Sequence, residues 1–63
     1  MPANGRTVEQ YLNTSVDDCD VSIRFIPDVN FLRRLLAECE RLGHKTRAVV
    51  VRRQIRRLEK ELR

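Results

Sequence analysis

A chain of 63 residues is close to the lower limit for an independent fold, because little apolar area can be buried at this size. Two cysteines and one histidine are too few for a disulfide framework or a zinc site, and no apolar run approaches the ~20 residues of a membrane span. The net charge of +4 is uneven, since residues 1–40 carry four basic and seven acidic side chains, whereas residues 41–63 carry nine basic and two acidic ones.

These features set the expected class of protein. The basic C-terminal third should attract a polyanion, and binding should weaken as salt is added. No catalytic set of serine, histidine and acid is visible, so we predict a protein that is not an enzyme, with no cofactor and no metal. We expect it to be soluble and cytoplasmic, and to complete its core by pairing with a second copy.

Residues 1–19 form the first predicted element, a flexible N-terminal arm. Pro, Gly, Asn, Ser and Asp are frequent there, and no helical or alternating period persists. A short helix from Thr7 to Leu12, with Thr7 as its N-cap, is an alternative for part of this arm. If the chain binds another protein, the arm is the expected contact.

Residues 21–26 predict a short β-strand, because apolar and polar side chains alternate and β-branched residues are frequent. The two faces of this strand carry Val21, Ile23 and Phe25 on one side, and Ser22 and Arg24 on the other. A strand needs a partner for its backbone hydrogen bonds, and no other segment has a strand pattern. We therefore expect the partner strand to come from a second copy of the chain.

Two helices are predicted after the strand. The first covers about 28–42, with Asp28 near its N-terminus and Gly43 as its C-terminal stop. The second covers about 46–62, with Thr46 as its N-cap. Apolar residues recur at steps of three and four in both helices. Together with the apolar face of the strand, the residues expected to form the dimer core are Leu32, Leu36, Val51, Ile55 and Leu58.

From about Asp20 to Leu58 the sequence resembles the ribbon-helix-helix superfamily of DNA-binding proteins. Three segments carry the resemblance: the alternating run that ends in Pro27 and Asp28, the apolar residue that directly precedes Gly43, and the Thr46-Arg47 pair at the start of the second helix. The resemblance implies a mainly helical domain over residues 20–63, in which two copies intertwine through an antiparallel two-stranded ribbon.

In such proteins the ribbon enters the major groove of double-stranded DNA, which assigns roles to individual residues here. The implied base contacts are Ser22, Arg24 and Asp20, and the implied phosphate contacts are Lys45, Thr46 and Arg47. An arginine suits base readout because its planar fork donates two hydrogen bonds to guanine. Asp20 departs from the family, which often has a basic or amide residue at this position.

The resemblance implies a sequence-specific DNA-binding homodimer that is associated with the nucleoid. A transcriptional repressor is the leading hypothesis, with higher-order assembly on tandem sites. A relaxosome accessory protein and an antitoxin that represses its own operon share the same fold and remain alternatives. An alternative from a different class is a basic helical hairpin that binds an acidic protein partner or a membrane surface. The strand separates these classes, because a hairpin has no need for alternation over residues 21–25.

Overall fold

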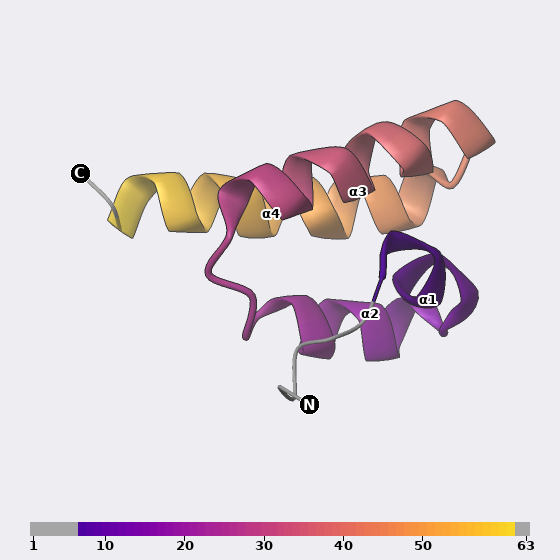
Figure 1. Cartoon of the computed structure of the whole chain (residues 1–63), viewed down its shortest axis with the longest axis horizontal. Coiled ribbons are helices and arrows are strands. Elements are labelled where there is room, and N and C mark those ends of the chain that lie inside the picture. Colours follow the sequence, from indigo (N-terminus) through magenta and orange to yellow (C-terminus); the bar gives the residue numbers. More distant parts are fainter. Residues whose placement is uncertain (1–6, 62–63) are drawn as a thin grey trace.

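The structure is a computed structural model that describes residues 7–61. It contains helices α1 (Val8–Asn13), α2 (Val16–Ile23), α3 (Val29–Leu42) and α4 (Lys45–Glu61), and no strand within the described range. Figure 1 shows α3 and α4 side by side and antiparallel, with α1 and α2 forming a second layer beneath them. The extents of the molecule are 31 × 28 × 18 Å.

Two short helices occupy most of the segment that we expected to be a flexible arm. Thr7 caps α1 in a reciprocal capping box with Gln10, so the alternative of a short helix at this position is confirmed. Ser15 caps α2 by accepting a hydrogen bond from the amide of Asp18. Because both helices pack on α3 or α4, the described part of the predicted arm belongs to the fold, whereas residues 1–6 lie outside the described range.

The hairpin of α3 and α4 agrees with the predicted pair of helices. Asp28 is the N-cap of α3, and its carboxylate accepts hydrogen bonds from the amides of Asn30 and Phe31 at 3.0 and 3.3 Å. Gly43 ends α3 with φ of 79°, the left-handed conformation that glycine adopts without a steric penalty. The second helix begins at Lys45, so the prediction that Thr46 is its N-cap is wrong.

The core lies where three of the helices meet. The fully buried side chains are Ile23 and Cys19 from α2, Leu32, Leu35 and Cys39 from α3, and Val51 from α4. Tyr11 joins α1 to this core by packing edge-on against the ring of Phe31, with the ring centroids 5.8 Å apart. A single copy of the chain therefore buries a continuous apolar cluster without a second subunit.

The predicted strand at residues 21–26 is wrong, and with it the ribbon-helix-helix fold and the intertwined dimer built on that ribbon. This segment forms the last turn of α2 and the turn that follows, in which the amide of Ile26 donates to the carbonyl of Ile23. The alternating pattern competes with a helical one: Cys19, Ile23 and Ile26 follow at steps of four and three, and all are buried. A helix also satisfies its own backbone groups, so no partner strand is needed.

The residues predicted to form a dimer core divide into two groups. Ile23, Leu32, Val51 and Ile55 are buried within one chain, and Leu36 and Leu58 pack against the same cluster, so these six residues serve the core of a monomer. Val21 and Phe25 are instead exposed, with 54% and 72% of their surfaces accessible. The helical path explains the difference, because it turns these two side chains away from Cys19 and Ile23.

Candidate nucleic-acid interface

The outward side of α4 carries a row of basic side chains. Its members share one side of a single helix and are all exposed: Lys45, Arg52, Arg53, Arg56, Arg57 and Lys60. We call this set the basic surface of α4. At a rise of about 1.5 Å per residue, the surface extends over roughly 23 Å, opposite the side that packs on α2 and α3.

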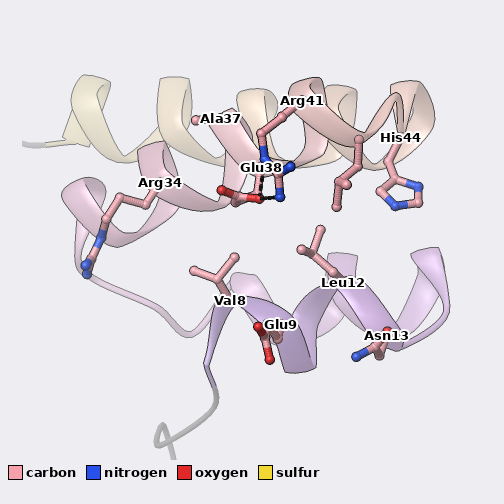
Figure 2. A pocket seen from close by; sticks show the side chains of 10 residues that line it. Val8, Glu9, Leu12, Asn13, Arg34, Ala37, Glu38, Arg41 and His44 are labelled. Carbon is pink, nitrogen blue, oxygen red and sulfur yellow. Dashed lines mark hydrogen bonds and ion pairs between the residues drawn. The ribbon is translucent and has the colours of Figure 1, made fainter.

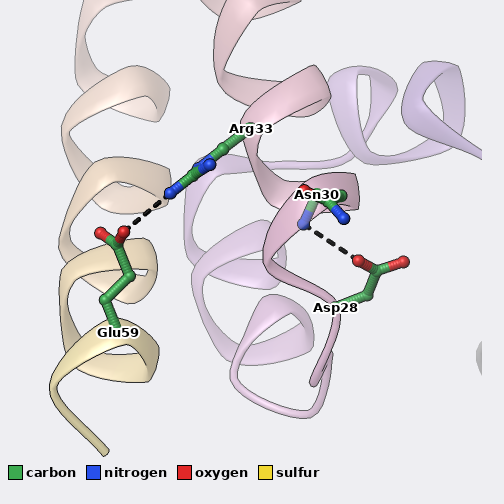
Figure 3. Close-up of polar contacts among 4 residues, drawn as sticks. All are labelled: Asp28, Asn30, Arg33 and Glu59. Atoms are coloured by element: carbon green, nitrogen blue, oxygen red, sulfur yellow. Dashed lines mark hydrogen bonds and ion pairs between the residues drawn. The ribbon is translucent and has the colours of Figure 1, made fainter. Parts of the chain in front are cut away.

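Few carboxylates neutralise this surface. Arg52 forms an ion pair with Glu40 at 3.3 Å, and both side chains are about half exposed, so the pair is weak. Glu59, an acid within α4, faces α3 instead and accepts a hydrogen bond from Arg33 at 2.7 Å, as Figure 3 shows together with the Asp28 cap. The other five cations form no ion pair with any residue between 7 and 61.

The middle of the basic surface contains a small hollow of about 290 Å³, lined by Val49, Arg52, Arg53 and Arg56. Val49 is 49% exposed and is the apolar member of this lining. The hollow therefore combines a small apolar wall with the positive charge of three guanidinium groups.

Arg47 does not belong to this surface, although it was predicted to contact phosphate. The side chain is buried, and its two terminal nitrogens donate to the carbonyl oxygens of Tyr11 at 2.5 Å and Thr14 at 2.7 Å. These carbonyls lie at the C-terminal end of α1, where carbonyl groups fall outside the regular helical hydrogen-bond pattern. The Tyr11 carbonyl also accepts a hydrogen bond from the Thr14 hydroxyl at 3.0 Å. Arg47 thus joins α4 to α1, and it is not accessible to a phosphate in this structure.

The sequence contained a signal for this structural role. Arg47, Val51, Gln54 and Leu58 follow at steps of four, three and four, so Arg47 shares the side of α4 that faces the core, and Gln54 is buried there as well. A basic residue on an apolar stripe indicates a buried polar contact rather than an outward one. The Arg47 Nε atom is buried without a hydrogen-bond partner.

Both cysteines are free, which agrees with a sequence that has too few cysteines for a disulfide framework, and both are buried. Burial raises the pKa of the Cys19 thiol, and the neighbouring Arg47 guanidinium offsets part of that rise by a hydrogen bond and by its charge. Burial likewise raises the pKa of Cys39. Both thiols are therefore protonated at neutral pH and serve as small apolar side chains in the core.

The residues predicted to contact bases lie apart from the basic surface of α4. Asp20 and Ser22 are half-buried in α2, and Arg24 follows at its C-terminal end, where its guanidinium pairs with Asp20 at 3.3 Å. The ribbon on which their base contacts depended is absent. Of the three predicted phosphate contacts, Lys45 and Thr46 are exposed in the first turn of α4, and Lys45 belongs to its basic surface.

Another hollow, of about 730 Å³, lies between α1 and α3. Figure 2 shows Val8 and Leu12 of α1 pointing into it, across from Glu38 and Arg41 of α3, which form an ion pair. The lining mixes apolar residues with both signs of charge. This groove therefore lacks the concentrated positive charge that a nucleic acid requires.

Comparison of the chain with protein-family models, with curated proteins and with solved structures gave no match. The assignment of the candidate site therefore rests on the geometry and charge of this chain alone. Within residues 7–61, no helix combines the length and apolar character needed to cross a membrane.

Proposed function

We propose that the chain binds double-stranded DNA through phosphate contacts made by the basic surface of α4. The observation that carries this proposal is the row of five exposed cations, Lys45, Arg53, Arg56, Arg57 and Lys60, that no carboxylate of the described chain pairs with. A DNA duplex offers one negative charge per about 1.7 Å of its axis, which is denser than the charge on an ordinary protein surface. Its phosphates therefore suit a long helix with basic side chains along its outward side.

The alternative of a basic helical hairpin on a membrane surface has less support. An amphipathic helix enters a bilayer surface with its apolar side, and the apolar side of α4 packs on α2 and α3 through Val51 and Ile55. The outward side contributes only Val49 as a large exposed apolar residue.

Phosphate contacts position a protein on DNA without reading its sequence. The proposed binding is therefore to the DNA backbone and includes no base contact.

The salt dependence of binding tests this proposal. If all five unpaired cations contact phosphates, the logarithm of the association constant should fall with the logarithm of salt concentration with a slope of about −4.5. Raising NaCl from about 50 to about 200 mM should then weaken binding by about 500-fold. Fluorescence anisotropy with a labelled duplex of ~20 base pairs measures this slope. A slope shallower than about −1, or no binding at about 50 mM NaCl, would contradict the proposal.

A further inference from the structure

The strongest unexplained feature outside the basic surface of α4 is the outward side of α2. Val21 lies in the last turn of α2 and Phe25 in the turn that follows this helix; both are exposed, and Phe25, with 72% of its surface accessible, is the most exposed large apolar residue in the described chain. Single exposed apolar residues are ordinary, whereas a group of them can mark a contact surface. We call these two residues the α2 patch.

The surroundings of the α2 patch are acidic. Asp17 and Asp18 are exposed in the first turn of α2, and the helix contains no basic residue between Val16 and Ile23. Arg24 follows the helix and is paired with Asp20. A partner of the α2 patch should therefore be basic, with a small apolar site for an aromatic ring.

The chain itself presents a surface with this chemistry. The hollow on α4 has Val49 as its apolar wall and Arg52, Arg53 and Arg56 around it. A phenylalanine ring placed there would contact Val49 and lie against guanidinium groups, which attract the face of an aromatic ring. The aspartates beside the α2 patch would face the arginines around the hollow. Both the charges and the apolar atoms of the two surfaces are complementary.

One copy cannot make this contact with itself. The two helices pack against each other through their inner sides, with Cys19 and Ile23 of α2 and Val51 of α4 fully buried. The α2 patch and the basic surface of α4 therefore face away from this contact. We propose that the α2 patch of one copy docks into the α4 hollow of a second copy, in a head-to-tail contact.

A head-to-tail contact joins two different surfaces, so each added copy leaves one surface of each kind free. The assembly should grow with concentration rather than stop at a dimer. The contact is small compared with the ~1,600 Å² of a standard interface, so association should be weak and reversible. It should also weaken with salt, because charge attraction across the contact is screened. None of this depends on DNA binding.

The test uses two full-length variants, each with one surface destroyed. Val21→Ser/Phe25→Ser removes the α2 patch, and Arg53→Glu/Arg56→Glu reverses the charge around the hollow. All four side chains are exposed, so both variants should fold, and circular dichroism checks this. Sedimentation equilibrium up to about 0.5 mM protein at low salt then measures the average mass of each variant, of their equimolar mixture and of the unmodified chain.

We expect the average mass of the unmodified chain to rise with concentration and to fall when salt is added. Each variant alone should remain a monomer. Their mixture should form a one-to-one dimer that grows no further, because only one intact patch and one intact hollow are then available. A control with the same loss of charge, Arg34→Glu/Arg41→Glu on α3, should associate like the unmodified chain.

Three results would overturn the proposal. The first is an unmodified chain that stays a monomer over the whole concentration range. The second is a patch or hollow variant that still associates by itself, as it would if two like surfaces paired. The third is a mixture of the two variants that stays monomeric while the unmodified chain associates.

Discussion

Replacing Arg47 with methionine should lower the free energy of unfolding by about 3 kcal/mol, which is most of the stability expected for a chain of this size. Methionine fills a similar length without donors, so the two hydrogen bonds that Arg47 donates to the carbonyl oxygens of Tyr11 and Thr14 are lost, while the Tyr11 carbonyl still accepts from the Thr14 hydroxyl. A hydrogen bond to a charged group contributes about 1.5–3 kcal/mol to stability. Replacing the guanidinium also removes the cost of burying its charge. This gain offsets only part of the stability lost with the hydrogen bonds.

Urea denaturation followed by circular dichroism measures the effect of Arg47→Met. Arg57→Met is the matched control, because Arg57 lies on the same helix and is exposed, and its replacement should change stability by less than about 0.5 kcal/mol. Arg47→Lys should fall between the two, since an ammonium group keeps the charge but lacks the planar fork that reaches two carbonyls. Equal stability of Arg47→Met and Arg57→Met would show that Arg47 does not join α4 to α1.

The second large effect concerns DNA affinity. Arg53→Glu/Arg56→Glu should weaken duplex binding by at least about 100-fold at about 50 mM salt, because two phosphate contacts are lost and two repulsions replace them. The salt slope should become shallower by about two units for the same reason. Anisotropy titration of the same labelled duplex measures both quantities.

The control for this experiment is Arg34→Glu/Arg41→Glu, which removes the same amount of positive charge from the other side of the molecule. Both of its side chains are exposed on α3, near the groove between α1 and α3. Breaking the exposed ion pair of Arg41 with Glu38 should cost less than about 1 kcal/mol of stability. If the two variants weaken DNA binding equally, net charge rather than the basic surface of α4 controls affinity.

The sequence predicted those parts of the fold in which local chemistry and packing favour the same structure. Asp28 and Gly43 mark the ends of α3, and Thr7 marks the start of α1, because each position requires a specific cap or backbone conformation. The number of cysteines predicted free thiols, but not the burial of Cys19, which lay in the segment expected to be a flexible arm. The basic character of the C-terminal helix was visible in the sequence as well, and its described arginines apart from Arg47 are exposed, as is usual for this residue.

The prediction at residues 21–26 was wrong because a six-residue window fits both periods. Val21, Ile23 and Phe25 alternate as in a strand, whereas Cys19, Ile23 and Ile26 follow a helical stripe, and the second set is the one that is buried. Ser15, with Asp17 and Asp18 in the first turn after it, is a typical helix N-terminus and favours the helical interpretation. The strand was predicted from the alternation alone, without regard to this signal.

The candidate site was predicted in part. The excess of positive charge in residues 41–63 indicated the helix, but it did not separate Arg47 from the arginines that follow it. Arg47 and Arg57 have the same chemistry, and only their positions relative to the apolar stripe make one buried and the other exposed. The exposed α2 patch was assigned to a dimer core, because its burial was inferred from the wrong secondary structure.

The most direct test of the central claim is a titration of the isotope-labelled full chain with a short DNA duplex, followed by amide NMR. The structure predicts helical chemical shifts and sequential contacts for residues 16–23 in the free protein. On adding DNA, the largest shift changes should fall on the outward positions of α4 that carry the five unpaired cations, at residues 45, 53, 56, 57 and 60. Strand-type shifts at residues 21–26, or changes that centre on that segment, would contradict both the fold and the proposed interface.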